Sequence, residues 1–208
     1  MAISILSTPV INGLVYTGTF GSAGEYHVVF ERQNLTSGVY RSVATAITLG
    51  GAAMTLLASM EWQGDYVVAI WGMHVTPALA GTAFTMVRTA GTYALTDRLD
   101  VAVLSGVSTN PLVAKHEHRI SPAASSYSHI IATEYGGMVL DSLGAIGDTG
   151  APDSGQSYLF NSTYQSSYKS GLDNGTSTIG WTWTVARACY ACVSLRALRV
   201  GGGIMGIV

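Results

Sequence analysis

Short windows in which apolar and polar residues alternate one by one recur along most of this chain. They are rich in Val, Ile, Tyr, Thr and Trp, which suit half-buried β-strands, and Gly, Asn, Asp and Pro separate them. The windows predicted to be strands are Gly13–Phe20, Tyr26–Glu31, Val39–Leu49, Asp65–Val75, Ala83–Arg88, Leu99–Gly106, Ser128–Tyr135, Ile179–Ala186 and Tyr190–Val200. The pattern predicts an all-β fold, an antiparallel two-sheet sandwich or jelly roll.

Three stretches admit another interpretation. Gly51 to Ser59 and Ala186 to Leu198 contain good helix formers, so a mixed α+β fold is the alternative. Val43 to Met60 is uncharged and as long as a membrane-spanning helix, but its Gly50-Gly51 pair and its threonines favour a strand, a turn and a second element. Residues 137–180 are rich in Ser, Gly, Asp and Asn, which predicts either a surface loop region or two short strands with a long excursion.

The low charge of the chain limits its partners. Charged residues make up 11% of the sequence against about 25% in an average soluble protein, and hydrophobic residues make up 48%. We therefore expect neutral polar residues and neighbouring subunits to cover much of the surface. The net charge is −2 and the basic residues are scattered, so the sequence predicts no nucleic-acid partner. It also predicts no membrane partner.

The C-terminal end combines flexible and apolar residues. We expect one domain over residues 1–200, followed by a Gly-rich apolar tail over residues 201–208. Leaving the apolar side chains of the tail in water is unfavourable, so we expect the tail to dock on a neighbouring subunit of a homo-oligomer. The side chains predicted to make this subunit contact are Ile204, Met205, Ile207 and Val208.

Motifs of catalysis and of cofactor binding are missing from the sequence. There is no nucleophile elbow, phosphate-binding loop, dinucleotide-binding fingerprint or zinc-protease motif, so we expect no enzymatic activity and no cofactor. Glu134 and Asp141 form a conceivable carboxylate pair, which keeps a hydrolase on a jelly-roll scaffold as an alternative. Acids in Gly-rich loops can also be calcium ligands, and the Gly-rich region carries four of them, Asp141, Asp148, Asp153 and Asp173. Their spacing matches no calcium-binding motif, so we interpret all four as turn-forming residues.

Two further pairs of residues have metal-ligand character. Cys189 and Cys192 stand alone as a Cys-X-X-Cys pair, and on a strand they would point to opposite faces, so we expect buried free thiols. His116 and His118 share one face of an extended segment, but no third ligand is evident nearby. We therefore predict no metal site and interpret the histidine segment as a solvated strand edge.

Aromatic residues near the C-terminal strands suggest sugar binding as a rival function. Trp181 and Trp183 lie two apart on one face of a predicted strand, and aromatic rings can stack on sugar rings. The residues of this possible glycan-binding site are Trp181, Trp183, Tyr158, Tyr164 and Tyr168. The alternative is that one of these tryptophans anchors the core.

Three segments resemble a β-sandwich family of structural proteins of tailed bacteriophages and prophages. They are VATAITLGGAAMT from Val43, GDYVVAIW from Gly64 and LDVAVLSGV from Leu99, with a weaker likeness at Trp181 to Arg196. The resemblance covers roughly residues 40 to 136 and concerns strands and turns. It implies a virion component of the head-decoration, head-fibre or tail type.

Taken together, these observations predict a non-enzymatic structural protein that packs against itself and other virion proteins. Residues 1–7 show no secretion signal, so we expect synthesis in the cytoplasm. The resemblance implies that this is the cytoplasm of a host bacterium and that the final location is the virion. The alternative is a carbohydrate-binding module that recognises a host surface glycan.

Overall fold

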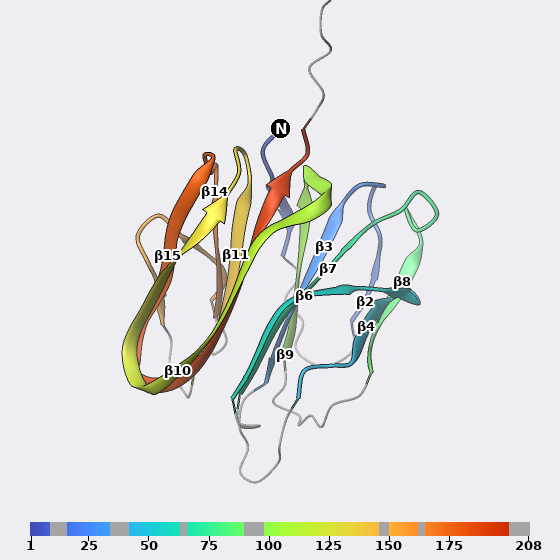
Figure 1. Ribbon diagram of the computed structural model, residues 1–208. Coiled ribbons are helices and arrows are strands. Elements are labelled where there is room, and N and C mark those ends of the chain that lie inside the picture. The colour runs from blue at the N-terminus through green and yellow to red at the C-terminus, as the bar shows by residue number, and fades with distance from the viewer. Residues whose placement is uncertain are drawn as a thin grey trace, which may run out of the picture.

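Figure 1 shows the computed structural model of the chain. The structure describes residues 1–8, 16–33, 42–62, 66–89, 98–145, 150–161 and 165–199. Within these ranges all helices and strands assigned to the chain are β-strands. The described residues therefore contain no helix that is long and apolar enough to cross a membrane. The strands are β1 (Ser4–Ser7), β2 (Thr17–Thr19), β3 (Tyr26–Gln33), β4 (Ala46–Leu49), β5 (Ala52–Ala53), β6 (Thr55–Trp62), β7 (Tyr66–His74), β8 (Ala83–Thr89), β9 (Arg98–Ser105), β10 (Val107–Thr133), β11 (Met138–Ala145), β12 (Ala151–Pro152), β13 (Ser157–Asn161), β14 (Gln165–Ser170) and β15 (Gly175–Ala197).

The strands form three antiparallel sheets arranged in layers (Figure 1). The central sheet has the order β1-β9-β3-β7-β6, and a smaller sheet of order β2-β8-β4-β5 covers one of its faces. The third sheet, of order β10-β15-β11-β14-β13 with β12 beside β15, covers the other face. The prediction of an all-β antiparallel sandwich is confirmed, and its jelly-roll form stays a prediction.

Burial on both faces explains why the middle strands of the central sheet are so apolar. Val28 and Phe30 of β3 pack toward the third sheet, whereas Val29 packs toward the smaller sheet. Every residue of β3 is buried, as is every residue of β7 before His74. A strand covered on both faces requires apolar residues at successive positions, and the run of six residues from Tyr66 in β7 supplies them.

Two successive residues of β3 form buried ion pairs. Arg32 pairs with Asp100, and both side chains are fully buried. Glu31, on the opposite face of β3, accepts hydrogen bonds from Arg88 Nε at 2.7 Å and from Trp71 Nε1 at 3.2 Å. Buried charges require such partners, because an unpaired charge in the core costs several kcal/mol, on the order of 3–5.

The longest strands, β10 and β15, pair with each other as one ribbon that folds back on itself (Figure 1). Their pairing runs from Val107 with Ala197 to Thr133 with Gly175, and its register shifts between Ile120 and Ser126. We call residues 107–120 and 188–197 the proximal half of the ribbon and residues 126–133 and 175–183 the distal arm. A separate apolar core lies between the two, and it includes Ile131, Ile179 and Trp181.

Several local predictions need correction. The helical alternatives for Gly51–Ser59 and Ala186–Leu198 are wrong, because these segments belong to β5, β6 and β15. The loop-like region after residue 137 instead contains β11, β12, β13 and β14. Its polar composition suits strands here because buried serines of β14 bond to Asp141 of the third sheet and to Arg32 of the central sheet.

Candidate functional site

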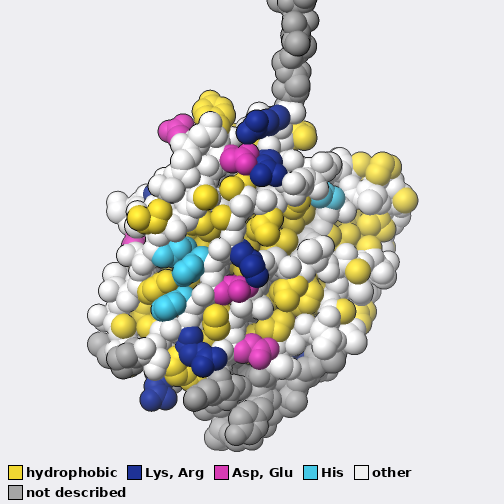
Figure 2. All heavy atoms as spheres, in the orientation of Figure 1, with side chains coloured by type: hydrophobic (Ala, Val, Ile, Leu, Met, Phe, Trp, Pro, Cys, Tyr) yellow, Lys and Arg dark blue, Asp and Glu magenta, His cyan; other side chains and the backbone are white. Residues whose placement is uncertain are grey.

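Four parallel rings lie where the distal arm meets the proximal half. His116 and His118 come from the proximal half of β10, and Tyr127 and His129 come from the distal arm of the same strand. The His116 and His129 ring centroids lie 4.0 Å apart, and those of His118 and Tyr127 lie 4.4 Å apart with an interplanar angle of 4°. We call these four side chains the ring cluster. Histidine side chains gather on this face of the molecule (cyan, left, in Figure 2).

Polar contacts tie the ring cluster together and connect it to β15. His116 Nε2 lies 2.6 Å from Tyr127 Oη, and His129 Nε2 lies 3.3 Å from the Cys192 thiol. Burial, followed by the nearby His116 and His118, lowers the pKa of His129 to about 4. Burial, together with His118, also lowers the pKa of His116. Both lowered pKa values favour neutral imidazoles in the stacked ring cluster.

A buried carboxylate lies beneath the ring cluster and binds both halves of the ribbon. Asp141 of β11 accepts hydrogen bonds from Tyr190 Oη of the proximal half at 2.9 Å and from Trp181 Nε1 of the distal arm at 3.0 Å. It also accepts bonds from Ser167 N at 3.1 Å and from Gln156 Nε2 at 3.1 Å. Burial raises the pKa of Asp141, and the hydrogen bonds that it accepts partly oppose this effect.

Several of the side chains described above belong to residue types that bind metal ions. Among the described residues, no group of three or more His, Cys, Asp or Glu side chains is placed to hold a metal ion. His116 and His118 do share one face, as predicted. Sequence reasoning missed that Tyr127 and His129 join them; the repeated spacing of two ring residues, His-X-His and Tyr-X-His, was the available signal.

The remaining candidate residues from the sequence are acids and two cysteines, and those that the structure describes contact other side chains of the fold. Asp141 lies in a strand and not in a turn, which corrects that interpretation, and Asp148 lies outside the described residues. Glu134 is bound by Arg196, whereas Asp141 accepts its hydrogen bonds from Trp181, Tyr190 and other residues of the third sheet. Cys189 and Cys192 form no disulfide and are buried, and they belong to different apolar cores, as expected for opposite faces of a strand.

The predicted aromatic platform for sugars is wrong as far as the two tryptophans are concerned. Trp181 is 0% exposed and Trp183 is 6% exposed, because both indoles fill the core between the distal arm and the proximal half. Tyr158 is 38% exposed, but its hydroxyl donates to Gly150 O at 2.7 Å. Tyr168 packs partly buried against the central core, and Tyr164 lies outside the described residues.

Exposed apolar side chains meet at the end of the molecule where Met1 lies close to Leu198. Met1 is 72% exposed, Tyr135 is 73% exposed and Leu198 is 41% exposed, and together they line a hollow of about 420 Å³. The Met1 amino group donates to Leu198 O at 3.4 Å, which joins the first residue to the segment after β15. We call this region the C-terminal pole. The predicted contact residues Ile204, Met205, Ile207 and Val208 follow it in sequence and lie outside the described residues.

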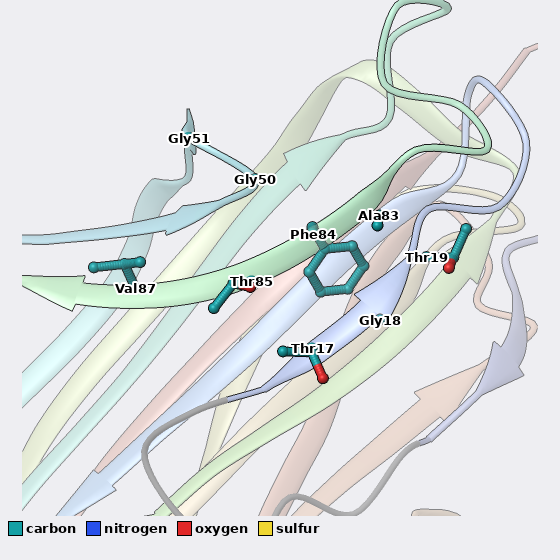
Figure 3. Close-up of a pocket in the computed structure, with 9 residues that line it drawn as sticks. All are labelled: Thr17, Gly18, Thr19, Gly50, Gly51, Ala83, Phe84, Thr85 and Val87. Atoms are coloured by element: carbon teal, nitrogen blue, oxygen red, sulfur yellow. The ribbon is translucent and has the colours of Figure 1, made fainter.

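A second, wider hollow of about 700 Å³ lies over the smaller sheet (Figure 3). The Phe84 ring points from β8 toward Gly18 of β2, and a Cβ at Gly18 would lie 2.9 Å from that ring. Gly50 and Gly51, whose positive φ angles of 57° and 80° form the turn after β4, border the hollow. Its remaining lining residues are Thr17, Thr19, Ala83, Thr85 and Val87.

Comparison with known proteins gives no relative from which a role could be transferred. The chain matches no protein-family model, no curated protein and no solved structure. Its function must therefore be argued from the two features described above, the C-terminal pole and the ring cluster.

Proposed function

We propose that this chain is a non-enzymatic structural subunit that assembles through its C-terminal pole. The observation that carries the proposal is the meeting of Met1, Tyr135 and Leu198 around one hollow at the point where the apolar tail continues from Arg199. Large apolar side chains that share an exposed hollow favour a protein contact.

The energetics favour association at this pole. Complete burial of one Val, Leu, Ile, Phe or Met side chain stabilises a contact by about 1.5–3 kcal/mol. The tail carries Ile204, Met205, Ile207 and Val208, and the pole adds exposed apolar side chains of its own. The ionic partners at the pole are satisfied within the chain, since Arg196 and Arg199 both bind Glu134. Apolar burial is therefore the main source of affinity in this contact.

The setting that we propose is a virion of a tailed bacteriophage. This part of the proposal depends on the sequence resemblance of residues 40 to 136, which implies a head-decoration, head-fibre or tail protein. The partners would then be further copies of this chain and other virion proteins, assembled in the host bacterial cytoplasm. A charged fraction of 11% is in keeping with a surface that subunit contacts cover.

The experiment is light scattering after size-exclusion chromatography on the full chain and on a truncation that ends at Val200. We expect a defined oligomer for the full chain and a monomer for the truncation. The double variant Ile204→Asp/Ile207→Asp should also be a folded monomer, because charges on the tail prevent its burial.

A matched control is Val87→Asp, which adds a charge at another exposed apolar residue, 51% exposed on the smaller sheet. This variant should assemble like the full chain. A stable monomer in every form would overturn the proposal and leave glycan recognition as the hypothesis to test. Unchanged assembly of the truncated chain would refute the tail as the contact.

A further inference from the structure

The ring cluster joins parts of one strand that would be far apart if the strand were straight. His116 and Tyr127 are separated by 11 positions, which corresponds to roughly 36 Å in an extended strand at about 3.3 Å per residue. Their polar atoms nevertheless lie 2.6 Å apart, because β10 folds back between them. The ring contacts therefore exist only while the distal arm is folded onto the proximal half.

We propose that the ring cluster is an acid-sensitive clasp, which holds the distal arm closed near neutral pH and releases it in mildly acidic solution. His116 stacks on His129 and His118 stacks on Tyr127, so imidazoles from both halves of the ribbon lie in contact. A proton on one imidazole places a positive charge against its neighbours, and a second proton adds repulsion between like charges.

The groups around the ring cluster leave the added charge poorly compensated. The titratable side chains that face it are Tyr190 and Cys192 of β15, and Asp141 of β11 lies behind Tyr190 with its hydrogen bonds already made. Glu117 is the nearby acid that favours protonation of His116. That carboxylate already binds Lys115 Nζ at 3.0 Å and Ser59 N at 2.8 Å. No acid faces the stacked pair itself among the groups that affect the pKa of His129.

The direction of the pH effect follows from the lowered pKa values. The pKa of His129 falls from 6.5 in the open chain to about 4 in the closed arrangement, so the open form binds more protons between these values. The closed form is thus fully favoured above pH 6.5 and loses stability as the pH falls toward 4. At pH 5 the opening equilibrium should rise about ten-fold, once solvent screening of a half-buried ring is included.

Release of the arm would uncover an apolar surface. Ile131 is 3% exposed, and Ile179 and Trp181 are 0% exposed, because the inner face of the arm packs against the proximal half. Opening would also break the bond from Trp181 Nε1 to Asp141 and the short pairing of β12 with Thr182 and Trp181. The arm is then a strand pair with a free apolar face, whose exposure acid would control.

The test is hydrogen–deuterium exchange read by mass spectrometry at pH 7.5 and pH 5, with labelling times scaled to the intrinsic exchange rates. For the wild-type chain we expect protection of residues 126–133 and 175–183 to fall about ten-fold at pH 5 relative to β6 and β7. The double variant His116→Phe/His129→Phe keeps two stacked rings that cannot be protonated, so its arm should remain protected. The matched control His74→Phe, outside the ring cluster, should retain the acid response.

Equal protection of the wild-type arm at both pH values would overturn the proposal, as would an acid response that persists in the double variant. Loss of protection in β6 and β7 to the same extent would show global unfolding and refute a local clasp. A nuclear magnetic resonance titration of the wild-type imidazoles does not depend on the folding of any variant. The titration should give His129 a pKa well below the ordinary value for histidine, and an ordinary pKa for His129 would refute the clasp.

Discussion

Removal of the Asp141 carboxylate is predicted to be among the most destabilising single changes in the third sheet. Asp141 is 1% exposed and accepts bonds from Ser167, Trp181 and Tyr190, as well as from Gln156. Asp141→Ala leaves the indole and phenol donors buried without an acceptor, at about 1–3 kcal/mol each. With incomplete rearrangement, we expect the free energy of unfolding to fall by about 3–5 kcal/mol.

The side-chain geometry also ranks the variants. Asp141→Asn keeps the volume and one acceptor oxygen, which can still serve Ser167, but its amide places a donor against Trp181 Nε1. We expect a loss of about 2–3 kcal/mol, smaller than that of the alanine variant. Urea denaturation followed by circular dichroism measures both values, and the exposed Asp173→Ala is the control, expected within about 0.5 kcal/mol of wild type. A loss below about 1 kcal/mol for Asp141→Ala would contradict the role of Asp141 as a shared acceptor.

Two further changes test the central sheet. Gly72→Ala should lower the free energy of unfolding by about 1–3 kcal/mol, because the added Cβ would clash with Tyr26 Oη. Adding Tyr26→Phe to this variant should recover part of the loss, and urea denaturation measures both values. His27 is 3% exposed and burial lowers its pKa, so the stability it contributes is lost as the pH falls below its unfolded value of 6.5. His27→Phe should therefore show a smaller drop in unfolding free energy between pH 7 and pH 5 than wild type, and an equal drop would exclude His27 as a source of acid sensitivity.

The sequence predicted best the strands whose burial is uniform along their length. The windows Tyr26–Glu31 and Asp65–Val75 correspond to β3 and β7, because β-branched and aromatic residues fill both faces of the central sheet. Strand β14, with the sequence QSSYKS, was not recognisable. Its serines are buried because Asp141 and Arg32 supply hydrogen-bond partners from other strands, and composition alone does not show such partners.

The ring cluster illustrates a different limit of sequence reasoning. Alternation correctly placed His116 and His118 on one face, but His129 joins them only because the ribbon reverses direction after Ile120. The reversal is a long-range property, since it depends on the pairing of β10 with β15 and on the core that the two halves enclose. Trp181 is buried because of the same reversal of the ribbon, so its ring cannot form an exposed aromatic platform.

One edge strand of the central sheet, β6, is a less favourable place for assembly than the pole. A free edge strand such as β6 invites pairing with a strand of another chain. Here two charged side chains of β10 occupy its backbone groups: Glu117 accepts from Ser59 N at 2.8 Å, and Arg119 donates to Glu61 O at 2.9 Å. The Arg119 guanidinium also lies 4.9 Å from the ring centre of Trp62, which holds it over the edge. A partner strand would have to displace both charges, whereas Met1, Tyr135 and Leu198 at the pole are already exposed and need only lose water.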